Sequence, residues 1–477
     1  MRGFRLLVFL AELNGLETWA TDIASAYLEA YTSEKVYIIA GPEFGALEGH
    51  VLVIDRALYG LRTSGQRWHD RLAACLRNEG FTPSRIEPDL WLRPNGDLYE
   101  YIGVNVDDLA FAMKDPQAFV DTLTSKYNFK VKGTGPIQFH LGADFEREAD
   151  GTLVMSPTKY IARMVQTYER FYGCKPSTRA LSPLEPNDHP ELDKSELLDD
   201  EGIQQYQSLI GCLQWSISLG RFDISVAVAS MSSYRAAPHR GHLDRVKQIC
   251  GYLYKMKDAK LRFRTHAPDY SDITVEKPDW SSIYGDVKEL LPTDAPPPLG
   301  KTVTLTHYVD ANLYHDAITG RSLTACLHFV NATPIDWYSK KQSTVETATY
   351  SSEFVAGRTC VEQIIDLRTT LRYLGVPIEE TSYMFGDNES VVNSATNMYA
   401  KLHKGHTLLA FHRVREAIAS GFIAFSFIPG KINPADILSK HWMYRSLWPM
   451  LKALLFWPAD TNDMDESPVD RSDNGPN

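Results

Sequence analysis

The sequence contains no run of about 18 apolar residues, so a membrane-spanning helix is not expected. The apolar segment 2–14 is short, carries Glu12 and lacks a small-residue cleavage site, so we interpret it as a core helix and not as a signal peptide. The six cysteines are widely spaced and include no CxxC pair. This spacing argues against a disulfide framework or a zinc knuckle and fits a reducing compartment.

An excess of basic residues is also lacking, since the 477-residue chain has a formal net charge of −11. The acidic residues are unevenly distributed, however. Segments 185–201, 266–299 and 458–477 hold 21 of the 60 acidic residues and only four of the 49 basic ones. The rest of the chain is therefore mildly basic, which permits binding to phosphates without demonstrating it.

The acidic segments also indicate how the chain is divided. Segment 266–300 is rich in Pro and acidic residues, so we place the main boundary there; 185–201 is interpreted as a surface loop. The predicted units are 1–172, 173–265, the linker 266–300, 301–445 and a disordered acidic tail 446–477. Because both ends of 301–445 fall in polar segments, we expect this unit to fold independently.

Helical and strand-like patterns alternate between these boundaries, which predicts an α/β (α+β) fold. Segment 67–81 has the pattern of an amphipathic helix that Gly80 ends. The runs YEYIGVNV and LAFAM flank Asp107 and Asp108, as in a β-hairpin. Three strand-like runs follow the linker, and a long helix then ends at Gly375.

Three motifs of the first half occur in a distinctive order: WATDIASAYLEA, ALYGLRTSGQRWHDRL and YIGVNVDDLAFAM. Together they resemble the palm of reverse transcriptases from copia-type retrotransposons. Segments 140–165 and 206–255 resemble the following palm and thumb or connection regions. The resemblance implies that Asp22, Asp107 and Asp108 bind two Mg²⁺ or Mn²⁺ ions, and that Tyr27 lies under the sugar of the incoming dNTP. Each residue taken alone is also compatible with an ordinary turn or a packing role.

Two features of that family are absent. Asn105 stands where the family has Tyr before the VDD motif, and the basic fingers segment that holds the triphosphate is missing upstream of Arg2. We therefore expect the chain to be an N-terminally truncated piece that extends primers poorly.

Four acidic residues of the second half stand in similarly distinctive contexts, HYVDANLYHD, TYSSEFVAG, SYMFGDNESVV and KINPADILSKHW. With WYSKKQSTVETATYSSEF and KGHTLLAFHRVRE, they resemble the copia-type ribonuclease H domain. The resemblance implies that two Mg²⁺ or Mn²⁺ ions are held by Asp310, Glu353, Asp387 and Asp436. Individually each acid could be a helix cap or a solvated side chain. The mobile His that cellular ribonucleases H carry before the last Asp is absent.

Basic side chains are candidates for contact with nucleic acid, although a solvated surface is an equally good interpretation. Arg62, Arg67 and Arg71 fall on nearly one helix face with Trp68 between them. Residues 240–260 of the thumb-like region contribute a second basic group that includes Lys247 and Lys255. Arg413 belongs to a third basic stretch, which also contains His406 and His412.

We therefore predict a palm–thumb, reverse-transcriptase-like half followed by a ribonuclease H-like domain. The predicted function is RNA-directed DNA synthesis with cleavage of the RNA strand, within a copia-type Pol polyprotein. Its expected partners are an RNA template, a DNA primer, the RNA–DNA hybrid and dNTPs. The expected location is the cytoplasm, in virus-like particles, with the nucleus as a further site. The alternative is a degenerate or domesticated remnant that binds nucleic acid without polymerising.

Overall fold

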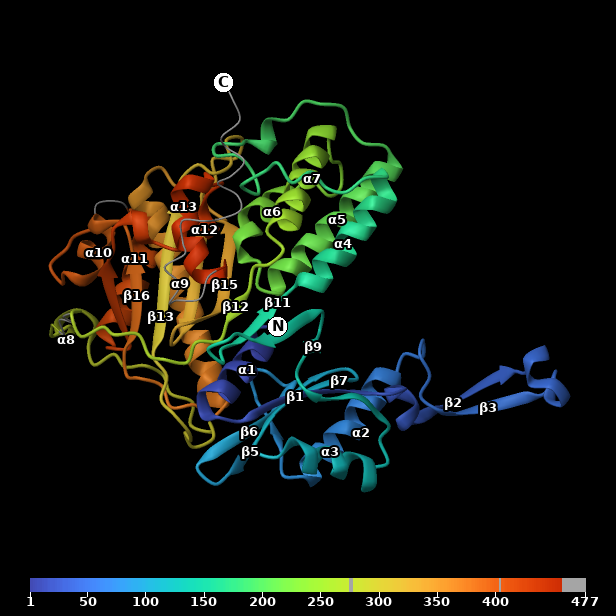
Figure 1. Cartoon of the computed structure of the whole chain (residues 1–477). Coiled ribbons are helices and arrows are strands. Elements are labelled where there is room, and N and C mark those ends of the chain that lie inside the picture. The colour runs from blue at the N-terminus through green and yellow to red at the C-terminus, as the bar shows by residue number, and fades with distance from the viewer. Residues whose placement is uncertain (274–277, 403–404, 457–477) are drawn as a thin grey trace.

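The computed structural model describes residues 1–273, 278–402 and 405–456. It has two halves: a lower lobe built on an antiparallel sheet, and an upper lobe in which a helical region lies beside a second sheet (Figure 1). No helix among the described residues is long and apolar enough to span a membrane. The mixture of helices and strands confirms the predicted fold class.

The lower lobe is a six-stranded sheet with the order β4-β5-β6-β7-β1-β8. Its central strands are β1 (Glu17–Ile23), β6 (Leu98–Asn105) and β7 (Asp108–Met113). The outer strands are β4 (Thr82–Pro83), β5 (Leu90–Asn95) and β8 (Val131–Pro136). The predicted hairpin is therefore present, with Asp107 in its turn and Asp108 as the first residue of β7.

Helices cover both faces of this sheet because alternate side chains of each strand point to opposite sides. The predicted N-terminal core helix, α1 (Arg2–Asn14), packs against Tyr101, Ala110 and Ala112. On the other face, α2 (Ser64–Asn78) and α3 (Pro116–Ser125) pack against Ile102 and Phe111. The amphipathic helix predicted before Gly80 is α2. A two-stranded ribbon, β2 (Tyr31–Ile39) and β3 (Val51–Arg56), protrudes from this lobe (Figure 1).

The helical region is accompanied by a small sheet with the order β12-β11-β10-β9. Its strands are β9 (Phe139–His140), β10 (Ala143–Arg147), β11 (Leu153–Ser156) and β12 (Leu261–Arg262). Strands β9, β10 and β11 precede the helices in the chain, and β12 follows them. The helices are α4 (Thr158–Tyr172), α5 (Asp200–Ser218), α6 (Ser225–Ser232) and α7 (Arg240–Lys255). They enclose a core of apolar side chains that includes Tyr206, Leu213 and Val246.

The second large sheet has the order β15-β14-β13-β16-β17. It contains β13 (Leu305–Asn312), β14 (Leu323–Val330), β15 (Thr333–Lys341), β16 (Ser382–Gly386) and β17 (Ile423–Phe427). The first three strands form an antiparallel meander, and β16 and β17 add in parallel to β13. This mixed arrangement is that of a ribonuclease H-like domain, as predicted.

Both faces of this sheet are buried. The predicted long helix, α9 (Thr349–Tyr373), lies on one face with α10 (Glu389–Thr396) and α11 (Leu408–Ala419). The other face contacts α6 and the short helix α12 (Asp436–Ser439). Cys326 of β14 faces α9, whereas Ala325 and Leu327 belong to the same apolar cluster as the thumb-like helices. The ribonuclease H-like sheet therefore shares a core with the preceding half.

Segment 266–300 was expected to be a linker, but its described residues, 266–273 and 278–300, make packing contacts with the ribonuclease H-like unit. The Glu289 carboxylate accepts hydrogen bonds from Arg368 and Arg372 of α9, at 2.6–2.9 Å. Trp280, just before the single-turn helix α8 (Ser281–Tyr284), is buried. The acidic composition suggested a linker, but Arg368 and Arg372 supply the opposite charges that hold Glu289 against α9.

The predicted tail also begins later than residue 446. Helix α13 (Tyr444–Leu451) and a π-helical turn (Lys452–Phe456) continue the fold. Leu447, Leu451 and Leu455 are buried in the cluster shared with the thumb-like helices. Their apolar spacing explains why residues 446–456 pack against the fold. Residues 457–477 lie outside the described residues.

Candidate active sites

The palm-like site lies at the β6–β7 hairpin and the facing strand β1. Asp22 of β1 is the direct cross-strand partner of Asp108, and Asp107 stands in the adjacent turn. The turn places Val106 at a φ of 59°, which is an uncommon conformation for a β-branched residue. Trp68 of α2 donates a hydrogen bond from Nε1 to the Val106 carbonyl oxygen over 2.6 Å and so supports the turn from below.

The three palm carboxylates influence one another electrostatically. Burial raises the pKa of Asp108, and the charges of Asp107 and Asp22 raise it further. The Lys132 ammonium lies 3.0 Å from the Asp22 carboxylate and partly offsets this negative charge. Their oxygens do not form a group within 4.8 Å of one another in the described part of the chain. The structure thus places Asp22 and Asp108 side by side on paired strands, with Asp107 in the adjoining turn.

The other residues predicted for the palm make local contacts. The Tyr27 ring lies against Tyr59, with the ring centroids 4.5 Å apart. Arg62 is exposed but precedes α2, so the prediction that the three arginines share one helix face is wrong for Arg62. Arg67 donates to the Tyr31 carbonyl oxygen at 3.1 Å, and Arg71 lies 5.4 Å from the Phe129 ring. Trp68, in contrast, is buried between them and the sheet.

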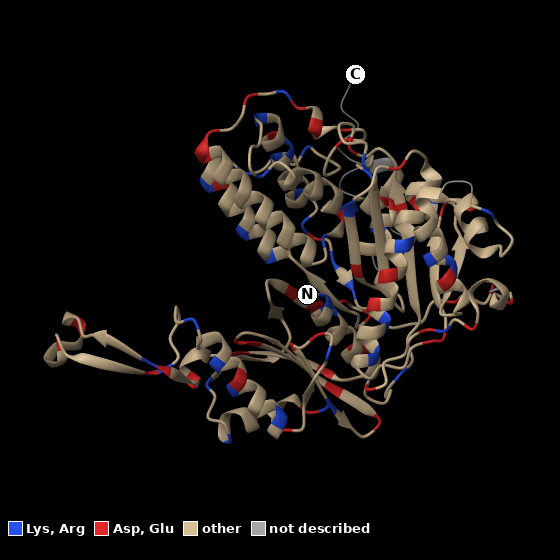
Figure 2. Cartoon of the chain, turned by 180° about the vertical axis from the view of Figure 1, so that it is seen from behind, with Lys and Arg blue, Asp and Glu red and all other residues tan. Residues whose placement is uncertain are grey.

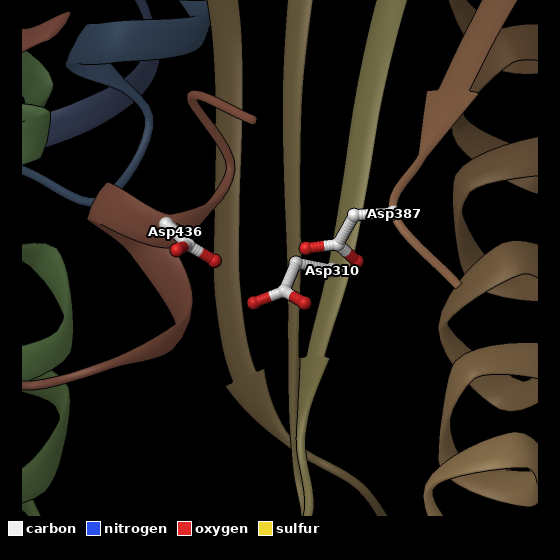
Figure 3. A group of neighbouring side chains, drawn as sticks. All are labelled: Asp310, Asp387 and Asp436. Atoms are coloured by element: carbon white, nitrogen blue, oxygen red, sulfur yellow. The ribbon is translucent and has the colours of Figure 1, made fainter. Parts of the chain in front are cut away.

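The ribonuclease H-like site brings together three acids from three different elements. Asp310 lies on the central strand β13, Asp387 directly follows β16, and Asp436 begins α12 (Figure 3). One carboxylate oxygen from each lies within 4.8 Å of the others. Hard divalent cations prefer several converging carboxylate oxygens, so this donor set fits Mg²⁺ or Mn²⁺.

The fourth predicted acid, Glu353, is buried on α9 next to this group. Burial raises its pKa well above the ordinary range, and the charges of Asp310 and Asp387 raise it further. Glu353 is not one of the three residues whose oxygens lie within 4.8 Å. It therefore belongs to the electrostatic environment of the cluster in this structure.

Asp436 and Asp310 are held by the segment that follows Asp436. Ser439 donates a hydrogen bond to the Asp310 carboxylate, and the Lys440 ammonium lies 2.6 Å from Asp436 Oδ1 and 3.4 Å from Asp310 Oδ2. Burial and the Asp310 charge raise the pKa of Asp436 to about 7, whereas Lys440 lowers it. Asn433, fully buried, donates to the Val309 carbonyl oxygen at 3.1 Å and fixes this segment on β13.

The remaining predicted contacts with nucleic acid are partly engaged within the protein. Lys247 lies over the Tyr172 ring at 4.1 Å. Lys255 of α7 is partly exposed and also interacts with another group of the protein. Arg413 pairs with Glu362 at 2.8 Å. Acidic and basic residues are interspersed over the helices of both halves (Figure 2).

Both His residues of the third basic stretch also make local contacts. His406 Nε2 lies 3.2 Å from Glu346, and His412 shares a hydrogen bond with Tyr284 at 2.7 Å. Arg245, from the thumb-like group, is bound by Asp188 and Asp193 of the acidic loop 185–201. That loop therefore neutralises part of the basic region that the sequence indicated.

The residues that support the sites but were not predicted from the sequence include Trp68, Asn433, Ser439 and Lys440. A signal was present only for Lys440, which follows Asp436 by four residues and so can reach the same carboxylate. Trp68 was noted only for its position among arginines. Its hydrogen bond to the hairpin depends on the tertiary placement of α2, which sequence spacing does not reveal.

Residues 1–181 match the protein family described as reverse transcriptase (RNA-dependent DNA polymerase). The retrovirus-related Pol polyprotein from transposon RE1 of Arabidopsis thaliana is 24% identical over 88% of this chain. The corresponding polyprotein from transposon TNT 1-94 of Nicotiana tabacum is 24% identical over 92% of this chain. The chain spans 26% and 31% of the length of these two relatives. These homologues confirm the resemblance to copia-type Pol polyproteins that the motifs predicted.

Solved structures also align with this chain. The foamy viral protease-reverse transcriptase in complex with RNA/DNA hybrid covers 88% of this chain and 45% of its own, at 11% identity and a TM-score of 0.40. LC11-RNase H1 in complex with RNA/DNA hybrid covers 28% of this chain and 94% of its own, at 16% identity and a TM-score of 0.24.

Proposed function

We propose that this chain is the reverse transcriptase and ribonuclease H region of a copia-type Pol polyprotein. It copies RNA into DNA at the palm and cleaves the RNA strand of the resulting hybrid at the second site. The observation that carries the proposal is the convergence of Asp310, Asp387 and Asp436 on a ribonuclease H-like sheet. The proposed partners are an RNA template, a DNA primer, the hybrid and dNTPs, within a cytoplasmic virus-like particle or the nucleus.

The cleavage site needs two Mg²⁺ or Mn²⁺ ions, which would activate the attacking water and stabilise the departing 3′-oxygen. Asp310, Asp387 and Asp436 would hold these ions, and the buried Glu353, which the charges of Asp310 and Asp387 affect, is the proposed fourth ligand. Asn433 and Ser439 keep the α12 segment against β13, so the carboxylates are oriented before substrate arrives. Such preorganisation is valuable because side chains need not rearrange during the reaction.

Asp387→Asn tests the cleavage assignment, since it keeps the shape of the side chain and removes its charge. The full chain should cut the RNA strand of an RNA–DNA hybrid with Mg²⁺ or Mn²⁺ and spare duplex DNA. In the variant, cleavage should fall by orders of magnitude, whereas salt-dependent hybrid binding should persist because Lys and Arg provide it.

Glu389→Gln is the matched control, because it removes an exposed charge two residues away on α10. It should cleave like the wild type. Equal cleavage by the wild type and Asp387→Asn would show that the carboxylate assignment is wrong.

At the palm, we propose that Asp22, Asp107 and Asp108 bind the two ions for DNA synthesis and that Tyr27 contacts the sugar of the incoming dNTP. The adjacency of Asp22 and Asp108 across β1 and β7 supports this assignment. Arg62, Arg67, Arg71, Lys247, Lys255 and Arg413 are proposed contacts to nucleic-acid phosphates. Asp107→Asn should abolish primer extension because it removes a metal ligand.

A remnant that binds nucleic acid without polymerising is the second candidate. Asn105, which stands where the family has Tyr, is the observation on its side. A folded chain that binds template–primer and hybrid but neither extends nor cleaves with Mg²⁺ or Mn²⁺ would establish this alternative.

A further inference from the structure

The Lys440 ammonium occupies an unusual place for a basic group, because it lies among the carboxylates of the cleavage site. Its Nζ is 2.6 Å from Asp436 Oδ1 and 3.4 Å from Asp310 Oδ2. Those two acids belong to the group whose oxygens lie within 4.8 Å of one another. The ammonium therefore contacts the carboxylates that are proposed to hold the divalent ions.

The backbone fixes this arrangement. Lys440 is the residue that ends the single turn α12, where the chain becomes extended at φ −129° and ψ 152°. Ser439, immediately before it, is fully buried and donates to the Asp310 carboxylate. Asp436, Ser439 and Lys440 thus approach Asp310 from one short segment. The lysine side chain remains 42% exposed, so its four-carbon stem has room to swing toward solvent.

We propose that Lys440 is the built-in counter-cation of this cluster: it holds Asp310 and Asp436 together before a divalent ion binds and competes with that ion for their oxygens. This inference rests on the proposed function of the site. Several carboxylates close together repel one another, and one ammonium relieves part of that repulsion. A divalent ion bound to the same carboxylates would repel the ammonium at short range. Lys440 therefore sets the metal concentration at which the site fills.

Lys440→Met and Lys440→Arg separate charge from packing. Methionine keeps an unbranched apolar stem without charge, and arginine keeps the charge. Divalent-ion binding is measured by calorimetry with Mg²⁺ and Mn²⁺ on the full chain carrying Asp107→Asn, so that the proposed palm site does not contribute, and this chain is the wild-type reference at Lys440 and Asp387. We expect Lys440→Met to bind Mn²⁺ several-fold to tens of times more tightly than the wild type. Its melting temperature should be lower in EDTA and should rise more when Mn²⁺ is added. Lys440→Arg should stay close to the wild type.

A second measurement needs no variant and so does not depend on the folding of Lys440→Met. The acetylation rate of Lys440 by acetic anhydride is measured by mass spectrometry with and without Mn²⁺. Displacement of the ammonium by the ion should raise labelling of Lys440 several-fold, whereas the exposed Lys35 of the β2–β3 ribbon should be unaffected.

The outcomes distinguish this inference from the proposed function. If the wild type binds Mn²⁺ and Asp387→Asn does not, the metal site stands. Unchanged or weaker Mn²⁺ binding by Lys440→Met, or unchanged labelling of Lys440, would then overturn the counter-cation role alone. Absence of Mn²⁺ binding by the wild type would overturn both.

Discussion

The Asp436 carboxyl group lies between the Asp310 carboxylate and the Lys440 ammonium, so its pKa depends on both neighbours. Burial and Asp310 raise its pKa to about 7, and Lys440 acts in the opposite direction. Asp387 also has a raised pKa because it is partly buried and faces Asp310. The carboxylates of Asp310, Asp387 and Asp436 therefore repel one another, and a bound cation would relieve this repulsion.

This repulsion predicts a pH dependence of stability. An unfolded Asp loses its proton near its ordinary pKa of about 4, whereas folded Asp436 keeps it until about pH 7. Between these values the folded state binds more protons, so the free energy of unfolding falls as pH rises. In EDTA, denaturant unfolding should show a loss on the order of 2 kcal/mol between pH 5 and pH 8.

Asp436→Asn should make that slope shallower, because the amide does not titrate in this range, whereas Asp387 and Glu353 retain raised pKa values. Added Mg²⁺ should restore stability to the wild type at pH 8. Equal stability of the wild type at pH 5 and pH 8 in EDTA would contradict the raised pKa.

The carboxylates themselves were predictable from sequence, because each stands in a motif of the copia-type family. The apolar patterns beside these acids also suggested that Asp310 ends a strand, that Asp387 follows a strand and that Glu353 lies near the first turn of the long helix. It did not indicate that Glu353 would lie outside the closest group of oxygens. Such differences of a few ångströms depend on how α9 packs against the sheet, which residue spacing does not specify.

At the scale of single elements, the β6–β7 hairpin depends on a helix that is distant in sequence. The two apolar runs predicted the strands, yet the turn itself holds Val106 at a positive φ. A turn of this kind is maintained only if its surroundings hold it in place. The Trp68 indole provides such a support through its hydrogen bond to the Val106 carbonyl oxygen.

Trp68→Phe should therefore loosen the hairpin while keeping an aromatic ring against Phe129. The lost hydrogen bond should lower the free energy of unfolding by about 1 kcal/mol. Hydrogen exchange at the amides of residues 106–108 should become faster. Trp91→Phe, at a buried site in the same apolar cluster, is the matched control and should leave exchange in the hairpin unchanged. Unaltered exchange in Trp68→Phe would remove the proposed support.

At the scale of the whole molecule, the two halves are joined by more than one contact. Arg5 of α1 is buried, donates to the carbonyl oxygens of Ile335 and Ser218, and lies 4.1 Å from the Trp337 ring. Tyr101 donates to the Leu374 carbonyl oxygen at 2.9 Å. The polar flanks of residues 301–445 led to the expectation that this unit folds independently. Apolar residues of β14 instead complete the core of the thumb-like helices, which the composition of the flanks does not reveal. We therefore expect the whole chain to be the folding unit.

Glu289→Gln tests the attachment of segment 266–300. The change leaves the buried Arg368 guanidinium without its carboxylate partner, although backbone carbonyl oxygens of Glu379 and Glu380 remain. Breaking a buried ion pair in this way should cost about 3 kcal/mol in unfolding free energy and should speed proteolysis within residues 285–298. Glu12→Gln, which alters the more exposed pair with Arg147, should cost well under about 1 kcal/mol. Similar losses in both variants would contradict a structural role for the segment.

We propose that one chain carries two separate metal-dependent sites that act on the same nucleic acid. The most direct measurement follows a hybrid with a dye on the RNA template and another on the DNA primer, incubated with the full chain, dNTPs and Mg²⁺. Measured against the weak extension expected of the wild type, Asp387→Asn should retain primer extension and lose RNA cleavage, and Asp107→Asn should lose extension and retain cleavage. Loss of both activities in either well-folded variant, or of neither activity in both, would contradict the account.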